Sequence, residues 1–235
     1  MTHEIPKPIL EGEGHSDYER YLRTDALLAL QKTADEWVHR DELLFQTVHQ
    51  SSELWLKLAW NEIEEAARLV DAGDLAAANR LLRRAVDCFK LVTAALDMLE
   101  HMSPWEYQEI RVVLGHGSGF DSPGFRRVPK VTQRISTAFN KALDAAGLDL
   151  AELYQQGRRH EALYQLAEAL TDWDSRIWIW RFRHYTVVAR SLGEQTIGTQ
   201  GTPVEVLGKL IEHRYIPKLW KTRARLVELF DEEQA

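Results

Sequence analysis

One uninterrupted stretch, from Asp41 to Lys57, constrains the fold of this chain more than any other. It reads DELLFQTVHQSSELWLK and predicts a long helix that can run from Asp41 to about Asp71, a range without glycine or proline. Apolar residues recur in it at steps of three and four, which is the spacing of one face of an α-helix. The residues on that face are Phe45, His49, Ser52, Leu56 and Trp60. His49 therefore points with the apolar side chains, either as a core histidine bonded to a neighbour or as a functional imidazole in an apolar pocket.

The helical spacing continues along the chain and is never replaced by the alternation of a β-strand. Gly73 suits the end of the first helix, and Asp74 suits the start of a second one, expected over 75–101. The short connection between them predicts an antiparallel pair. A third, brief helix is expected to begin at Ser103-Pro104 and to end at Leu114-Gly115.

Further helices are predicted after the third one, with two glycine-rich loops between them. The helices cover residues 131–147, 148–170, 173–190, 203–213 and 217–232, and the loops are Gly115–Lys130 and Gly193–Pro203. Residues 1–16 are expected to form a mobile arm, followed by a short helix within Tyr18–Leu30. The chain is therefore predicted to be one all-α domain over residues 1–235, a bundle of long antiparallel helices.

Composition excludes several classes of function. A formal charge of −7 leaves no basic excess with which to neutralise the phosphates of a nucleic acid. No run approaches the roughly 20 apolar residues that span a bilayer, and the polar, acidic N-terminus is no signal peptide. Cys88 is the sole cysteine and cannot form an internal disulfide. We therefore expect a cytoplasmic protein with no nucleic-acid or membrane partner.

The motifs of several enzyme classes are absent as well. The chain has no GxSxG, no HExxH and no phosphate-binding glycine motif, and a single cysteine excludes a thiolate zinc site. A di-iron bundle requires two ExxH pairs on different helices. Glu36–His39 supplies one pair and no second follows, so a di-iron site is a weak alternative.

Two further pairs of residues, each four positions apart, repeat the pattern of Phe45 and His49. Tyr107 and Arg111 share one face of the short third helix, where a guanidinium among apolar neighbours needs an anionic partner. That partner is either an internal carboxylate or the carboxylate of a ligand. His184 lies four residues after Trp180 on an aromatic-rich helix, either as a packed histidine or as a functional one.

Four motifs, taken in order along the chain, resemble the tryptophan 2,3-dioxygenase family. They are YxxYLxxDxLLxLQ at Tyr18–Gln31, DELLFxxxHQxSELWLK at Asp41–Lys57, MSPWEYxxxRxxLGxxSGFxSxxFR at Met102–Arg126 and RHxxxVxRxxGxxxxGTxG at Arg183–Gly201. The resemblance implies a helical protein that binds haem b and assembles as a homotetramer, a dimer of dimers. It also implies insertion of O2 across the indole C2–C3 bond of L-tryptophan, which gives N-formylkynurenine.

The resemblance also implies roles for individual residues. His184 would be the proximal ligand of the haem iron, and the catalytic His49 would accept a hydrogen bond from the indole N–H. Arg111 would bind the substrate carboxylate. The other implied substrate-binding residues are Phe45 and Tyr107, Ser118 and Gly119 on the haem side of the pocket, Thr199, and Tyr18, Tyr21 and Leu22, which would reach into the site of a neighbouring subunit. In this interpretation the haem supplies the oxidative chemistry and the protein fixes the geometry.

Some positions depart from the family pattern. The family loop usually reads GTGGSSG, and its threonine helps to bind the substrate ammonium, whereas Gly198–Pro203 reads GTQGTP. Thr199 is the natural counterpart of that threonine, with one extra residue between it and His184. Asp121 stands where the family usually has glutamine, and the segment between Arg126 and Trp173 is compressed. These departures predict a divergent member in which the haem and carboxylate contacts are intact.

Three functions follow from these residues. The first is the dioxygenation of L-tryptophan, with haem b as cofactor and O2 as co-substrate. The second, motivated by the altered loop around Thr199, is a haem oxygenase, for example a monooxygenase in secondary metabolism, that acts on a modified tryptophan or related indole. The third is a non-catalytic helical assembly protein whose histidines are structural.

Overall fold

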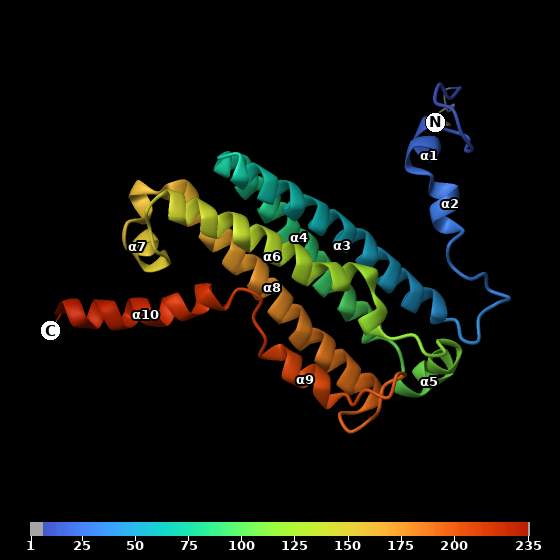
Figure 1. Ribbon diagram of the computed structural model, residues 1–235. Helices are drawn as coiled ribbons and strands as arrows, with labels where there is room; N and C mark the ends of the chain where they lie inside the picture. Colours follow the sequence, from blue (N-terminus) through green and yellow to red (C-terminus); the bar gives the residue numbers. More distant parts are fainter. Residues whose placement is uncertain (1–6, 235) are drawn as a thin grey trace, which may run out of the picture.

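Four long helices pack side by side in the structure, a computed structural model that describes residues 7–234 (Figure 1). They are α3 (Glu42–Asp71), α4 (Leu75–Leu99), α6 (Pro123–Ala145) and α8 (Glu161–Leu192). Helix α3 contacts α4 and α6, and α8 contacts the same two helices, so the four close into a bundle. The predicted all-α fold is confirmed, because residues 7–234 contain no strand. None of the helices in this range is both long enough and apolar enough to cross a membrane.

The two helices at the start of the bundle begin and end as predicted. Asp41 precedes α3, and the side chain of Asp74 caps α4 by accepting the backbone N–H of Ala77 at 3.0 Å. Gly73 turns the chain between them with a φ of 82°, a backbone angle that residues other than glycine rarely adopt. This tight turn returns α4 antiparallel to α3.

Helix α5 (Pro104–Val113) confirms the predicted third helix, but the loop predicted after it, Gly115–Lys130, is wrong in its extent. The loop contains a short 3-10 helix, η1 (Gly119–Asp121), and α6 already begins at Pro123. The hydroxyl of Ser122 caps α6, and a proline at the first helical position needs no N–H partner. Pro129 lies inside α6 and cannot donate a backbone hydrogen bond there. The burial of one face of the helix offsets the free-energy cost of that missing bond.

The two separate helices predicted over 148–170 and 173–190 are also wrong, because α8 is continuous. Only α7 (Leu150–Gln155) and the 3-10 helix η2 (Gly157–Arg159) lie between α6 and α8. Tertiary packing on α4 and α6 stabilises one long helix where the sequence pattern predicted two.

A buried tryptophan in the middle of α8 joins three of the long helices. Trp173 is 0% exposed, and its ring meets that of Phe89 on α4 edge to face, at 5.1 Å between centroids. Its indole N–H donates to the hydroxyl oxygen of Thr132 on α6 at 2.8 Å. The core therefore buries a large aromatic ring without leaving its polar atom unpaired.

The two C-terminal helices, α9 (Glu205–Ile211) and α10 (Pro217–Gln234), lie close to the predicted ranges. The buried carboxylate of Asp174 fixes the segment between them. It accepts the backbone N–H groups of Tyr215 at 2.9 Å and Ile216 at 3.3 Å, and the indole N–H of Trp220 at 2.8 Å. From this anchor α10 extends away from the bundle (Figure 1).

The N-terminal segment also projects from the bundle (Figure 1). The single short helix predicted there is two helices, α1 (Asp17–Leu22) and α2 (Thr24–Leu28), separated by Arg23 with a φ of 55°. Of the predicted mobile arm, residues 1–6 lie outside the described residues. Residues after them fold against α1, where Asp17 accepts the backbone N–H of Ile9 at 2.9 Å.

Helix α6 lies very close to α3 at Gly124. A Cβ atom at this position would lie 2.7 Å from Oε2 of Glu53 and 2.8 Å from the side chain of Leu56. With glycine, Glu53 accepts the backbone N–H of Gly124 at 2.9 Å and also the hydroxyl of Ser122. The missing side chain thus permits the contact that joins the start of α6 to α3.

We expect Gly124→Ala to lower the free energy of unfolding by about 1–3 kcal/mol, because the added methyl group must displace Glu53 or Leu56. Urea denaturation followed by circular dichroism measures the change. Gly208→Ala in α9 is the control, since its Cβ would meet Tyr185 at an ordinary 3.7 Å and alanine favours a helix. Unchanged stability of Gly124→Ala would contradict the close approach.

Candidate active site

Helices α3 and α5 bring three of the predicted residues together. Phe45 and His49 are one turn apart on α3, with 4.0 Å between their ring centroids. The ring of Tyr107 on α5 has its centroid 6.1 Å from that of Phe45. Burial raises the pKa of Tyr107, so its phenol stays protonated at ordinary pH and can donate a hydrogen bond.

A hydrogen bond to its own helix orients the ring of His49. Nδ1 lies 2.7 Å from the carbonyl oxygen of Phe45. A carbonyl oxygen only accepts, so Nδ1 carries the proton and Nε2 keeps a lone pair. Burial lowers the pKa of His49, which favours this neutral form. His49 is exposed to solvent although other side chains surround its ring, as expected of a residue that lines an open hollow.

His184 lies on α8 and stacks on Trp180, one turn earlier, with 4.8 Å between centroids and 10° between the ring planes. Phe125 of α6 packs on the same indole ring at 4.0 Å between centroids. Burial, and then the charge that His49 would carry, lower the pKa of His184 to about 4. Because a charge on His49 would act on His184, the two imidazoles lie at a common site, and the lowered pKa of each favours its neutral form at pH 7.

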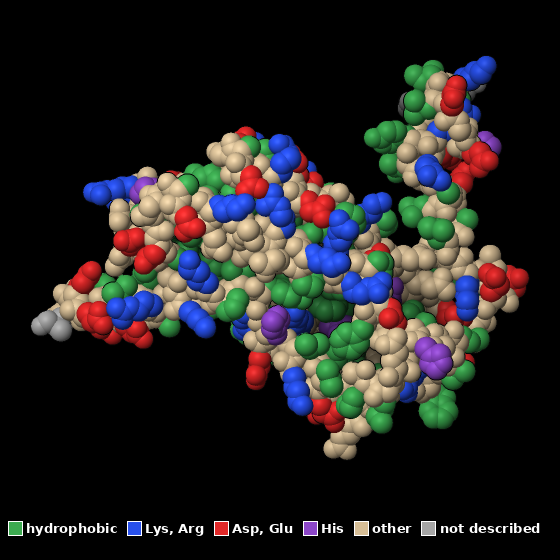
Figure 2. Space-filling model, viewed as in Figure 1, with side chains coloured by type: hydrophobic (Ala, Val, Ile, Leu, Met, Phe, Trp, Pro, Cys, Tyr) green, Lys and Arg blue, Asp and Glu red, His purple; other side chains and the backbone are tan. Residues whose placement is uncertain are grey.

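A hollow with hydrophobic side chains around it is visible on this side of the molecule (Figure 2). It lies where Figure 1 draws the N-terminal part of α6 and the C-terminal part of α8, the parts that carry Phe125 and His184. Within residues 7–234 the buried indole N–H of Trp180 has no hydrogen-bond acceptor. An unpaired buried donor beside an apolar hollow is the arrangement expected where a bound group supplies the acceptor.

Arg111 lies one turn after Tyr107 on α5 and reaches the second glycine-rich loop. Its guanidinium donates a hydrogen bond to the carbonyl oxygen of Ile197. No carboxylate lies within ion-pair distance of Arg111 in the described part of the chain, so the internal salt bridge weighed above is not formed. Its remaining N–H groups are available for the carboxylate of a ligand.

The loop Gly193–Pro203 packs against the connection between α5 and α6. The hydroxyl of Thr199 donates to the carbonyl oxygen of Gly117 at 2.6 Å. The side-chain amide of Gln200 donates to Oδ2 of Asp121 at 2.6 Å. Two glycine-rich segments that are far apart in the sequence therefore meet at the side of α5 that carries Arg111.

The family model described as tryptophan 2,3-dioxygenase matches residues 3–142 and 131–226 of the chain. The chain belongs to this family. The two matches overlap at residues 131–142, within α6. Membership in the family makes the protein an oxidoreductase.

Relatives in several bacteria agree with this assignment. The tryptophan 2,3-dioxygenase of Bacillus anthracis is 30% identical over 280 residues, which cover 95% of this chain and 99% of the relative. That of Bradyrhizobium sp. strain BTAi1 is 32% identical over 282 residues, with 96% and 100% covered. That of Myxococcus xanthus is 29% identical over 273 residues, with 94% and 93% covered. These alignments are longer than the 235 residues of this chain, so the relatives carry residues that it lacks.

The described residues suit the haem group that the family resemblance implied. A neutral imidazole such as that of His184 is a ligand for haem iron, and an apolar surrounding suits the faces of the macrocycle. The unpaired N–H of Trp180 suits an oxygen acceptor on such a group. The donor set and the polarity of the site therefore fit.

Glu53 is a residue of this site that the sequence analysis missed. It bonds the start of α6, and its negative charge acts on His49 one turn earlier on α3. Its position four residues after His49 is the signal that could have revealed it. Ser118 and Gly119 lie at the start of η1, and neither forms a hydrogen bond with His49 in the described chain. Glu53 thus links the histidine to the segment that carries them.

Tyr18, Tyr21 and Leu22 do not approach this site within their own chain. They lie on α1, which projects from the bundle, and they are 69%, 78% and 46% exposed (Figure 1). Aromatic residues so exposed can contact another molecule. Their role in the site of a neighbouring subunit stays a prediction.

A second polar cluster, formed by His39, Asp41 and Glu106, lies outside this site. Nδ1 of His39 accepts the backbone N–H of Asp41 at 3.2 Å, and Nε2 lies 3.7 Å from Oε1 of Glu106. A ring whose Nδ1 accepts carries its proton on Nε2, so it faces Glu106 as a donor rather than as a metal ligand. Glu36 bonds Thr33 in a turn, so Glu36–His39 is no helical pair and does not support a di-iron site.

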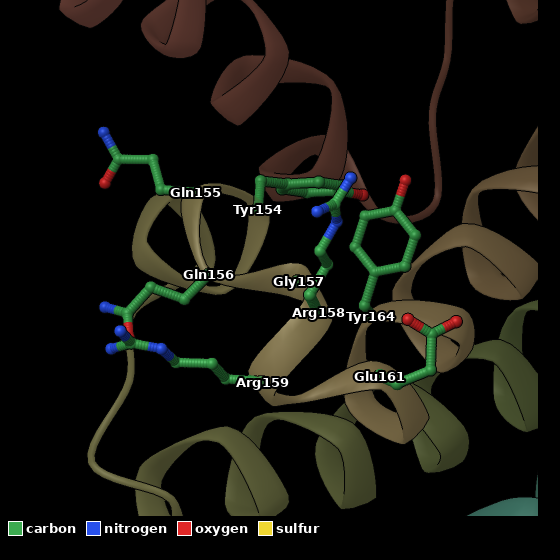
Figure 3. Close-up of a pocket in the computed structure, with 8 residues that line it drawn as sticks. All are labelled: Tyr154, Gln155, Gln156, Gly157, Arg158, Arg159, Glu161 and Tyr164. Atoms are coloured by element: carbon green, nitrogen blue, oxygen red, sulfur yellow. The ribbon is translucent and has the colours of Figure 1, made fainter.

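A pocket of about 620 Å³ lies at the other end of the bundle, around α7, η2 and the start of α8 (Figure 3). Tyr154 and Tyr164 line it, and their rings meet edge to face at 5.7 Å between centroids. The hydroxyl of Tyr154 donates to Glu168 at 2.7 Å, and Arg223 binds the same carboxylate at 2.6 Å. Burial and the bond to Glu168 raise the pKa of Tyr154 to about 12. None of the predicted site residues lines this pocket.

We expect His49 to be neutral, with its proton on Nδ1, and to take up a second proton only below its ordinary pKa of about 6.5, since burial disfavours the charged ring. NMR spectra of protein labelled with ¹⁵N-histidine report both the tautomer and the titration midpoint. His49→Gln identifies its signals. A midpoint at or above the ordinary value, or a proton on Nε2, would contradict the arrangement.

Proposed function

We propose that this protein is a haem-dependent dioxygenase that inserts O2 across the indole C2–C3 bond of L-tryptophan to give N-formylkynurenine. Family membership supports an enzyme of this kind. The structural observation that carries the proposal is the placement of two imidazoles, His49 beside Phe45 with Nε2 free to accept, and His184 stacked on Trp180. One ring is free to bind an iron, and the other has an acceptor nitrogen for a substrate N–H.

His184 is the residue that would hold the haem iron. Trp180 stacks on its ring and limits its rotation, and the indole N–H of Trp180 would donate a hydrogen bond to an acceptor on the bound group. When bound, haem b supplies the chemistry that activates O2. A thiolate ligand is not available to this site, because Cys88 is buried in the bundle core on α4.

The substrate is held by groups of matched polarity. His49 accepts the indole N–H through Nε2, and Phe45 packs on the same imidazole as an apolar wall. Arg111 donates to the carboxylate, beside the phenol of Tyr107. The hydroxyl of Thr199 has donated its hydrogen to Gly117, so its oxygen can only accept from the substrate ammonium. Neutral His49 is not a strong base, and its role is to orient the indole.

The protein assembles as a homotetramer, a dimer of dimers, in which Tyr18, Tyr21 and Leu22 of one subunit complete the site of another. The exposure of these side chains on a projecting helix supports this arrangement, because burying them against a partner is favourable. A cytoplasmic location suits a chain whose sole cysteine is unpaired.

We expect the haem-reconstituted protein to show a Soret band and, once reduced, to convert L-tryptophan in air to N-formylkynurenine. Mass spectrometry of the product tests the reaction, because dioxygenation adds two oxygen atoms and opens the ring. A monooxygenase for a modified indole would add one atom and keep the ring. His184→Ala should fold and lose the Soret band. Absence of haem binding by the native protein would overturn the proposal and favour a structural role for the histidines.

Arg111→Ala should lower kcat/KM for L-tryptophan roughly 10- to 100-fold, because a charge-assisted hydrogen bond to the carboxylate contributes about 1.5–3 kcal/mol. The affinity of this variant for tryptamine, which lacks the carboxylate, should differ little from that of the native protein, as measured by the shift of the haem spectrum. Glu109→Ala, on an exposed position of the same helix, is the matched control. An equal loss of affinity for both ligands would show that Arg111 acts only on the loop.

A further inference from the structure

The contact between Gln200 and Asp121 joins two loops that border the candidate site. The amide nitrogen Nε2 of Gln200 donates to Oδ2 of Asp121 at 2.6 Å and to the carbonyl oxygen of His116 at 3.0 Å. Oδ2 of Asp121 also accepts the backbone N–H of Ser118 at 3.1 Å. The carboxylate of Asp121 thus binds both the turn that begins η1 and the second loop. Hydrogen bonds to a charged acceptor are stronger than those between neutral groups.

Apart from this contact, the second loop is held by a few hydrogen bonds within its own backbone and by the contacts of Arg111 and Thr199. Gly198 and Gly201 flank Thr199 and Gln200, and glycine loses more conformational freedom on ordering than other residues. Gly201 has a φ of 75°, which glycine adopts readily. The only ladder contact inside the described loop is one isolated bridge between Ile197 and Pro203. The bond from Gln200 to Asp121 therefore limits the motion of the residues beside it.

Thr199 is the residue beside Gln200, and the direction of its hydroxyl hydrogen bond is fixed. Its hydrogen is donated to the carbonyl oxygen of Gly117 at 2.6 Å, in the same connection that contains Asp121. A hydroxyl has one hydrogen to donate, so the lone pairs of this oxygen are left for a donor. On the other side of the loop, Arg111 holds the carbonyl oxygen of Ile197.

We propose that Gln200 and Asp121 are positioning residues that hold the Thr199 hydroxyl, as an acceptor, in place for the ammonium group of the substrate before the substrate binds. The identity of that substrate as an amino acid rests on the proposed function. Residues 121 and 200 are two positions at which the chain departs from the family motif, and here they bind each other. The two departures therefore act as one unit that orders the loop in advance of binding.

Hydrogen–deuterium exchange tests the positioning without any turnover. In the haem-loaded protein without substrate, residues 193–203 should exchange about three to ten times faster in Gln200→Ala and in Asp121→Ala, the range expected for one lost hydrogen bond. Gln195→Ala is the matched control, because Gln195 forms no side-chain hydrogen bond in the described loop. Unchanged exchange in both variants would overturn the proposal even if the protein oxidises L-tryptophan. Faster exchange in both variants would support the positioning role even if the protein does not oxidise L-tryptophan.

Ligand binding tests the link to the ammonium group. The Kd for L-tryptophan should rise about three- to tenfold in either variant, with kcat nearly unchanged, because the loop must then be ordered on binding. The double variant should bind no more weakly than either single one, since both remove the same contact. Asp121→Asn keeps an oxygen acceptor and should retain most of the affinity. The Kd for indole-3-propionate, which has no ammonium, should stay the same. An equal rise for both ligands would overturn the role of Thr199.

Discussion

The close contact between α3 and α6 at Gly124 is the constraint on which the site depends. Because this residue has no side chain, Glu53 can reach the backbone N–H of α6 and hold the end of the connection that follows α5. Glu53 is one turn from His49 on the same helix, and its charge acts on that imidazole. One carboxylate therefore couples the packing of two long helices to the placement of the candidate catalytic residue and of the loop before α6.

Burial changes the state of three polar groups around the hollow. It lowers the pKa of both His49 and His184, and it leaves the indole N–H of Trp180 without an acceptor among residues 7–234. In water the imidazoles would be partly charged and the indole N–H would bind water. At this site the neutral form of each imidazole is favoured, and Nε2 of His49 is free to accept because its Nδ1 binds the carbonyl oxygen of Phe45. A neutral imidazole can bind a metal or accept a hydrogen bond, which a charged one cannot. The apolar bundle thus prepares the polar groups of the site.

Local signals predicted much of the helical structure and failed where tertiary packing decides. The turn at Gly73 and Asp74 follows from backbone freedom and capping, both properties of a few neighbouring residues. The start of α6 was placed too late, because four glycines and two prolines outweighed the cap at Ser122. The continuity of α8 was missed because it depends on tertiary contacts such as the burial of Trp173, which no local pattern reveals.

The amino-acid sequence by itself determined which residues share a helix face, and so it paired Phe45 with His49 and Tyr107 with Arg111. These pairs are four residues apart, and the helical period alone brings their side chains together. Only the tertiary structure decided that His184 lies near His49, that Arg111 binds a loop carbonyl rather than an acid, and that Gln200 bonds Asp121. Such contacts join segments far apart in the chain, and they depend on how helices pack, which no local period encodes.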